Sequence, residues 1–269
     1  MTATETAYDQ QWAAFRAERA AWARQPLGWL SLTGLHWLGD TGETVGDLPG
    51  RWRADAENVY VTVEPGQPEL LRDGAALTDA AVLTPGEGAP GLQVHTGDRI
   101  IEVIRRTGQF ALRVHDPAAP ALAAFVEIPV YEPHSRWVVT GRFEPFEQTR
   151  VVTTGAVVAG LEHHHTATGT VTFELNGDQR ELVVFGSEAL GLHLLFTDAT
   201  SGVTTYGGAR RLDLSRPAAD GTVTLDFNHA VNLPCAFTDY ATCPIAPAEN
   251  RLPVAVEAGE QDPRREASA

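Results

Sequence analysis

The chain has 269 residues, of which 43% are hydrophobic, and carries a formal net charge of -15 at pH 7. A chain of this length can bury a core without cross-links, and its two cysteines are too few for a disulfide scaffold. Its acidic surface repels phosphate groups, so binding to nucleic acid or to an anionic membrane is not expected.

The absence of lysine excludes several kinds of chemistry. All twenty basic residues are arginine, so the chain has no Schiff-base lysine and no Walker-type phosphate lysine. The G-x-S-x-G and H-E-x-x-H patterns are missing, and no G-x-G-x-x-G follows a predicted strand and opens a helix. These absences argue against the commonest hydrolases, zinc proteases and dinucleotide-binding enzymes.

An amphipathic helix is predicted over residues 6–24, with Pro26 just after its end. One of its faces carries Tyr8, Trp12, Phe15, Arg19 and Trp22. Such a stripe usually packs on a sheet, and the alternative is a helix that binds a partner. The N-terminal region lacks the apolar core of a signal peptide, and no stretch approaches ~20 apolar residues. We therefore expect a cytoplasmic protein with reduced thiols and no membrane attachment.

Short runs rich in Val, Thr and aromatic residues follow, separated by Gly and Pro. Among them are NVYVTV, RIIEVIRR, QFALRVH, RWVVTGRF, TRVVTTGAVV, TGTVTFEL, RELVVF, LGLHLLF, TTYG and TVTLDF. Many alternate between apolar and polar positions, as antiparallel strands do. Thr107-Gly108 and Asn176-Gly177 lie between such runs, so a hairpin is predicted at each.

These patterns predict a mainly β fold. About thirteen short strands without helices between them indicate an antiparallel closed barrel or a sandwich. One N-terminal helix and a long irregular C-terminal segment complete the expected architecture. We expect residues 1–260 to form a single β domain and residues 261–269 to form a disordered tail.

The segment over residues 226–260 differs in character from the rest of the chain. Four prolines interrupt its backbone, and Asn228, Asn232 and Asn250 supply amides that can cap loose backbone groups. Long ordered loops are often functional. The segment therefore either lines a binding site or pins one end of the sheet as an irregular lid.

Four stretches carry a resemblance to a known family: GWLSLTGLHWL, RRTGQFALRVHDP, TDATSGVTTYGGARRL and the segment DFNHAVNLPCAFTDYATCPIAPAENRLPVAVEAGE. Over nearly its whole length the chain resembles the bacterial and archaeal domain-of-unknown-function family numbered 1684. Leu233 and Ala246 stand where that family usually has proline, and His229 stands where a basic residue is common. The resemblance implies a shared fold and a shared site, but no activity.

The two cysteines, Cys235 and Cys243, have seven residues between them, which is not a tight zinc-ligand spacing. A disulfide is geometrically allowed, but a reducing compartment disfavours it. A nucleophilic thiolate would need a nearby base or cation, and the candidates are His229, His193 and Arg251. We expect two buried, inert thiols.

Three consecutive histidines form the run His163, His164 and His165. In a strand only the first and third share a face, so only these two could hold one metal ion. An exposed hairpin tip is the expectation here. No metal site is predicted, and no cofactor is assigned.

The stretch over residues 197–212 supplies candidate ligand-binding residues. Asp198 precedes a turn at Ser201-Gly202, and Tyr206 and Arg210 could face an anionic or carbonyl group. The alternative is a hairpin in which the glycines form a bulge. For Arg210 a functional role is favoured, since arginine is costly to bury unless paired.

Two further positions have open interpretations. Arg113, which precedes Asp116 at the end of a predicted strand, could clamp a carboxylate or belong to an internal ion pair. His36 lies between Trp29 and Trp37, where a core histidine is the usual finding. A histidine lining an aromatic pocket is the alternative.

Three functional hypotheses result. The first is a small-molecule-binding β-barrel with a polar pocket beneath residues 226–260, whose ligand is small and could be anionic. Its candidate residues are Arg113, Asp198, Tyr206, Arg210, Asn228 and Asn232. The second is an enzyme, a hydrolase or isomerase of a small metabolite, in which Cys235 or an Asp226–His229 pair acts as nucleophile or general base. The third is a structural or interaction module whose N-terminal helix meets a partner.

Overall fold

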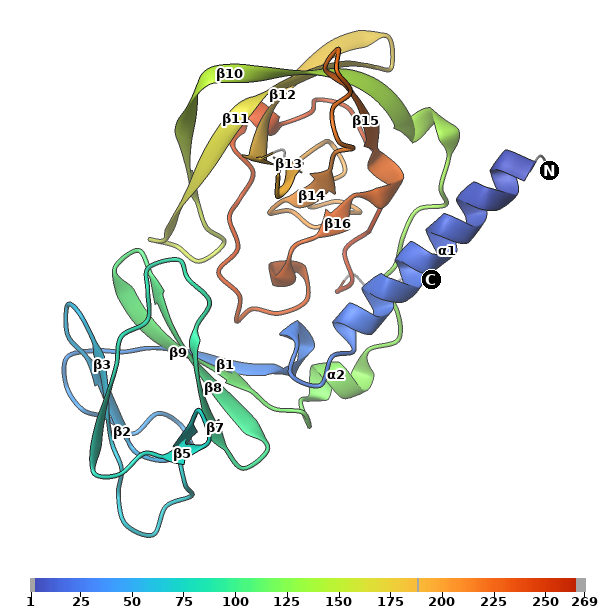
Figure 1. Ribbon diagram of the computed structural model, residues 1–269. Coiled ribbons are helices and arrows are strands. Elements are labelled where there is room, and N and C mark those ends of the chain that lie inside the picture. Colours follow the sequence, from blue (N-terminus) through green and yellow to red (C-terminus); the bar gives the residue numbers. More distant parts are fainter. Residues whose placement is uncertain (1–2, 188, 265–269) are drawn as a thin grey trace. The chain divides into compact units, whose positions relative to one another are not determined.

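The computed structural model describes residues 3–187 and 189–264 and is mainly β, with three antiparallel sheets and few helices (Figure 1). The chain divides into two compact units, Met1–Val126 and Glu127–Ala269. Within the described residues, no helix has both the length and the apolar character needed to cross a membrane. A single domain over residues 1–260 stays a prediction, and the last five residues of the predicted tail, 265–269, lie outside the described residues.

The predicted N-terminal helix is present as α1, which spans Ala3–Ala23. Its aromatic stripe is partly buried, whereas Glu18 is exposed. Within the stripe the rings of Trp12 and Phe15 stack with centroids 5.4 Å apart. The helical spacing therefore identified the less exposed face correctly.

The N-terminal unit contains a six-stranded sheet, β1-β9-β8-β7-β4-β5, and a three-stranded sheet, β2-β3-β6. Side chains of both sheets share one apolar core, in which Trp52, Ile101 and Leu112 are fully buried. Its strands are β1 (Leu32–Trp37), β2 (Arg51–Ala54), β3 (Val59–Thr62), β4 (Leu71–Arg72), β5 (Ala75–Ala76), β6 (Ala80–Leu83), β7 (Leu92–Thr96), β8 (Arg99–Arg106) and β9 (Gln109–His115). The 3-10 turn η1 (Trp29–Ser31) precedes β1, and the short helix α2 (Pro120–Ala124) follows β9.

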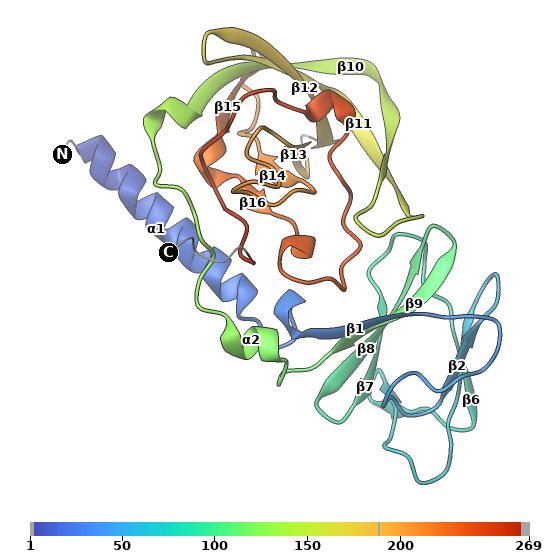
Figure 2. The ribbon, with the colours of Figure 1, turned by 180° about the vertical axis from the view of Figure 1, so that it is seen from behind.

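The C-terminal unit contains one seven-stranded sheet, β15-β10-β11-β12-β13-β14-β16. Strands β10 and β11 form a long curved hairpin that arches over the other strands of this unit in both views (Figure 1 and Figure 2). Its strands are β10 (Val138–Gly155), β11 (Glu162–Leu175), β12 (Asp178–Ser187), β13 (Gly191–Phe196), β14 (Arg210–Asp213), β15 (Thr222–Asp226) and β16 (Val231–Asn232). Its 3-10 turns are η2 (Ser135–Trp137), η3 (Phe227–His229), η4 (Pro234–Ala236) and η5 (Ala248–Asn250).

Both predicted hairpins are confirmed. Thr107 and Gly108 have positive φ angles of 51° and 76°, and Asn176 and Gly177 have φ angles of 55° and 85°. Positive φ at both central residues is the condition for the tight turn that matches the twist of antiparallel strands. These turns join β8 to β9 and β11 to β12.

Two details of the strand prediction are wrong. The runs RWVVTGRF and TRVVTTGAVV form one strand, β10, whose register shifts between Pro145 and Arg150. Proline has no N–H for the ladder, so it marks an irregular stretch within this strand. The run TTYG lies in a turn instead of a strand, because the carbonyl of Thr200 accepts the amides of Val203, Thr204 and Thr205.

Candidate functional site

Arg210 begins β14 on the face that carries Leu212 and is fully buried. Its Nη2 donates to Oδ2 of Asp198 at 3.0 Å and to the carbonyl of Val256 at 3.1 Å. Its Nη1 donates to the carbonyl of Ala258. The guanidinium that was proposed to meet a ligand is thus bonded to residues near the C-terminus of its own chain.

Asp198, the partner of Arg210, has both carboxylate oxygens engaged. Oδ1 accepts the amide of Thr200 at 3.0 Å and its hydroxyl at 2.6 Å. Oδ2 accepts the amide of Val256 at 2.8 Å besides the guanidinium. Both side chains of the pair have an exposed fraction of 0%. The ion pair is therefore inaccessible to water, and both carboxylate oxygens of Asp198 accept hydrogen bonds.

Asn232 lies beside Arg210, with which it is paired in the β14–β16 register. Its backbone amide donates to Oε2 of Glu260 at 2.7 Å, and its Nδ2 donates to the carbonyl of Gln261 at 2.7 Å. Three of the predicted ligand-binding residues, Asp198, Arg210 and Asn232, are thus brought together. All three form hydrogen bonds to the stretch of chain from residue 256 to residue 261.

Asp226, Asn228 and His229 form a second group at the end of β15. Nδ1 of His229 lies 2.9 Å from Oδ2 of Asp226, while Oδ1 accepts both the amide and the Nδ2 of Asn228. Burial by itself raises the pKa of Asp226, but the hydrogen bonds from His229 and Asn228 outweigh it and lower that pKa. The side chains of His229 and Asp226 are 30% and 21% exposed, so this carboxylate–imidazole pair meets solvent.

Tyr206 is half-buried, and both cysteines act on it electrostatically. Burial first, and then the neighbouring Cys235 and Cys243, raise the pKa of Tyr206 to about 12. The tyrosine ring packs on residue 208, where a Cβ would come within 2.7 Å of it, so this position requires Gly208. Each cysteine amide donates to the sulfur of the other cysteine, at 3.2 and 3.0 Å.

The run of histidines begins β11 instead of forming an exposed hairpin tip. The rings of His163 and His165 stack on one face with centroids 5.9 Å apart, as strand alternation predicts. His164 points the other way and meets the Thr153 hydroxyl at 2.9 Å. Across the described ranges, no three His, Cys, Asp or Glu side chains are arranged to hold a metal ion.

Arg113 belongs to the N-terminal unit and pairs across strands with Glu102 instead of with Asp116. Its Nη1 lies 3.2 Å from Oε2 of Glu102, and the two residues are in register on β9 and β8. Nε2 of His115 lies 3.6 Å from the same oxygen, and its Nδ1 lies 2.9 Å from the hydroxyl of Ser31. The internal ion pair, which was one of the two interpretations of Arg113, is therefore present.

Glu102 should make stability depend on pH. Burial by itself raises its pKa, but the contact with His115 and the charge of Arg113 outweigh it and lower the pKa to about 2. The folded-state pKa is below the unfolded value, so the stabilisation is complete above pH ~4.5 and is lost as the pH falls towards ~2. We expect Glu102→Gln to cost of the order of 3 kcal/mol at pH 7 and progressively less below pH ~4.5.

Urea unfolding of the wild type and of Glu102→Gln from pH 7 to pH 3 would measure this difference. Glu69→Gln is a suitable control, because Glu69 is an exposed glutamate of the same unit. A difference between wild type and Glu102→Gln that is constant over this range would contradict the assignment.

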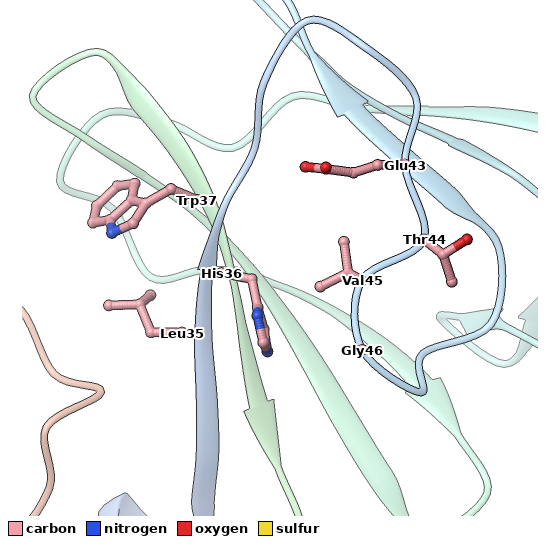
Figure 3. Close-up of a pocket in the computed structure, with 7 residues that line it drawn as sticks. All are labelled: Leu35, His36, Trp37, Glu43, Thr44, Val45 and Gly46. Carbon is pink, nitrogen blue, oxygen red and sulfur yellow. The ribbon is translucent and has the colours of Figure 1, made fainter.

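A hollow of about 370 Å³ lies between β1 and the loop that follows it in the N-terminal unit (Figure 3). It is lined by Leu35, His36, Trp37, Glu43, Thr44, Val45 and Gly46. His36 reaches towards the loop and Val45 points back towards the strand (Figure 3). A Cβ at position 34 would come 2.5 Å from the imidazole Nε2 of His36. Any other residue at position 34 would therefore clash with the His36 ring, whereas Gly34 does not.

The fold and these clusters define a mainly β protein with internally bonded polar groups and a hollow beside β1. The chain belongs to the family described as "Protein of unknown function (DUF1684)", whose model matches residues 123–261. Of the four stretches that carried the resemblance, the two that precede residue 123 lie outside this range. No curated protein matches the chain.

A solved structure similar to this chain is the solution NMR structure of an uncharacterized protein from Haloarcula marismortui. The two sequences are 29% identical, and the match covers 54% of this chain and 80% of that chain. The TM-score is 0.45.

Proposed function

We propose that this protein binds a small molecule in the hollow beside β1. The observation that supports this is the hollow itself, since a volume of about 370 Å³ falls within the range of small-molecule sites, about 300–1,000 Å³. His36 and Glu43 offer an imidazole and a carboxylate, and Val45 offers an apolar surface. Most of the surface exposed in the hollow is polar, so a ligand there would be held mainly by hydrogen bonds, unlike the usual site with a largely apolar lining.

The charges of the lining indicate the class of ligand. Glu43 accepts hydrogen bonds, and His36 can donate or accept one. A neutral or cationic molecule with hydroxyl or amino groups therefore suits this hollow better than an anion does. The location beneath residues 226–260 has less support, because Asp198, Arg210 and Asn232 are bonded to the chain's own backbone and side chains.

A metabolite library screened by the shift in melting temperature would test the proposal, after native mass spectrometry of freshly purified, untagged protein. We expect a ligand whose dissociation constant rises at least tenfold in Glu43→Gln and in His36→Ala. Glu69→Gln, an exposed glutamate away from the hollow, should bind as the wild type does. Equal binding by all four proteins, or no ligand at all from the library, would contradict the proposal.

The proposal includes closure of the seven-stranded sheet into a barrel. Support comes from the chain just after β14, where the amide of Ser215 donates to the carbonyl of Thr224 in β15 at 3.3 Å. The amide of Thr224 donates in turn to Oγ of Ser215 at 2.8 Å. These bonds join the first strand of the sheet order to the chain that follows the next-to-last one, and a contact between the two ends of the sheet is what closure requires.

Hydrogen exchange followed by NMR tests the closure. In a closed barrel the amides of Ser215 and Thr224 should exchange together with those in the centre of the sheet, such as Val171. If both exchange at least ~100-fold faster than Val171, the sheet has open edges there and is not a barrel.

A second candidate function is general-base catalysis by the Asp226–His229 pair. The contact of 2.9 Å between carboxylate and Nδ1 favours it, because a carboxylate in that place orients an imidazole base. Turnover of a panel of small esters and hydroxy acids should fall by about 10²-fold or more in His229→Ala. His164→Ala, a histidine of β11 on a different element, is the control. Unchanged turnover in His229→Ala would exclude this candidate.

A further inference from the structure

The two cysteines of the chain face each other in the C-terminal unit. Cys235 lies in η4 and Cys243 lies eight positions further on, beyond a turn that returns the chain. The amide of Cys235 donates to Sγ of Cys243 at 3.2 Å, and the amide of Cys243 donates to Sγ of Cys235 at 3.0 Å. This reciprocal pattern means that each side chain points at the backbone of the other cysteine.

The pattern limits the distance between the two residues. A backbone nitrogen is about 1.5 Å from its own Cα, so each sulfur lies within about 5 Å of the other residue's Cα. Side chains that point towards each other at this range are what a disulfide requires, together with a Cα–Cα separation below about 7 Å. The structure holds both residues as thiols.

The surroundings favour chemistry between these two sulfurs over metal binding. Cys235 is 2% and Cys243 is 8% exposed, so both are buried and Cys243 is the more accessible. Within the part of the chain that is described, no third His, Cys, Asp or Glu joins them as a metal ligand. Each sulfur accepts a backbone N–H, and such hydrogen bonds stabilise the thiolate, which is the nucleophile in disulfide exchange.

We propose that Cys235 and Cys243 form a redox-active pair that closes into an intramolecular disulfide, with a low-molecular-weight disulfide as oxidant. The thiolate of Cys243 attacks one sulfur of the oxidant, so a mixed disulfide forms and one small thiol leaves. The thiolate of Cys235 then attacks Sγ of Cys243, and the second small thiol leaves. The two cysteines lose two electrons and two protons, and the oxidant is reduced to two thiols that carry those protons.

As a redox-active pair, the two cysteines would link two parts of the C-terminal unit instead of remaining inert thiols. The disulfide would link η4 to the chain that follows Thr242, whose carbonyl lies 2.6 Å from Nε2 of His163 on β11. Oxidation would therefore fasten part of the irregular segment over residues 226–260 beside the sheet. It would also change the environment of Tyr206, whose pKa both cysteines help to raise.

Redox titration of the full chain in mixtures of reduced and oxidised glutathione tests the proposal. The chain has only two cysteines, so the mass after quenching with an alkylating agent and denaturing reports the state of this pair directly. We expect one product that lacks two hydrogens and takes up no alkyl group. We expect half-oxidation at a ratio of [GSH]² to [GSSG] at least tenfold higher for the folded chain than for the chain in guanidinium, because folding holds the thiols together.

The variants Cys235→Ser and Cys243→Ser are matched controls, because each keeps one thiol and cannot close the ring. Each should stop at a mixed disulfide with glutathione or stay reduced. The proposal is overturned if the folded wild type accepts two alkyl groups after oxidation, forms only mixed or intermolecular disulfides, or closes no more readily than the chain in guanidinium. Far-ultraviolet circular dichroism of the wild type and both variants confirms that folded proteins are compared.

Discussion

Arg210→Met should lower the free energy of unfolding by about 3–5 kcal/mol, because removing one partner of a buried ion pair leaves the other charge buried and unpaired. Asp198 would remain at 0% exposure with its Oδ2 facing an apolar side chain. The carbonyls of Val256 and Ala258 would also lose their donor. The side chain of methionine is of similar length, so the loss would not be due mainly to a cavity. Urea unfolding at pH 7 gives the measurement.

The neighbouring residue in β14 provides the control. Arg211 pairs with Asp213 at 2.7 Å, but these side chains are 39% and 68% exposed. Exposed pairs contribute about 0–1 kcal/mol, so Arg211→Met should have little effect. Equal losses for Arg210→Met and Arg211→Met would show that burial of the Arg210–Asp198 pair has no energetic consequence.

A double-mutant cycle separates the pair from the rest of the network. Arg210→Met combined with Asp198→Asn removes both charges and should cost clearly less than the sum of the two single changes. The same variants also test whether Arg210 binds a ligand. If Arg210 anchored a ligand, loss of binding would exceed what unfolding explains, whereas a structural role predicts that binding is lost only as the protein unfolds.

Local features of the fold could be predicted from the sequence because they depend on neighbouring residues. Strands β8 and β9 have the predicted limits, since their alternation and the Thr107-Gly108 turn are set within seventeen residues. The Asp226–His229 contact likewise spans only three positions. The TTYG run misled the prediction because hydrogen bonds to the carbonyl of Thr200 override its β propensity.

The long-range contacts of the candidate site could not be predicted in the same way. Asp198 meets Val256 fifty-eight positions away, and Arg113 meets Glu102 through the register of two strands. Composition indicated only that a buried arginine needs a partner. Whether that partner is a ligand or the chain itself depends on tertiary packing. The hollow beside β1 corresponds to the alternative interpretation of His36, a histidine lining an aromatic pocket, and the favoured interpretation as a core histidine does not hold, because His36 is only partly buried.

Asn250 is the clearest case in which a prediction from sequence is confirmed by a long-range contact. Its side chain was expected to cap loose backbone groups, and it is fully buried in η5. Strands β12 and β13 pair only from Phe185 with His193 to the end of their hairpin. Continued in that register, Val184 would pair with Leu194 and Val183 with Leu195, and the amide of Asn250 bonds to Val183 and Leu195 instead.

Asn250→Ala should therefore destabilise the protein strongly, by about 3 kcal/mol or more, because three buried backbone groups lose their partners at a cost of about 1–3 kcal/mol each. Oδ1 accepts the amide of Val183 at 2.7 Å, and Nδ2 donates to the carbonyls of Val183 and Leu195 at 2.8 and 3.0 Å. Asn250→Asp should be no better, because a carboxylate cannot donate to those carbonyls and adds a buried charge.

The adjacent residue Glu249 supplies the matched control for Asn250. Its pair with Arg150 at 3.4 Å is about half exposed, so Glu249→Ala should cost less than about 1 kcal/mol. Hydrogen exchange at the amide of Val183 adds a local measurement: it should be slow in the wild type and in Glu249→Ala and much faster in Asn250→Ala. Slow exchange at Val183 in Asn250→Ala would mean that the two strands pair directly once the amide is gone. In that case Asn250 itself separates β12 from β13 in the wild type, instead of filling a gap that exists without it.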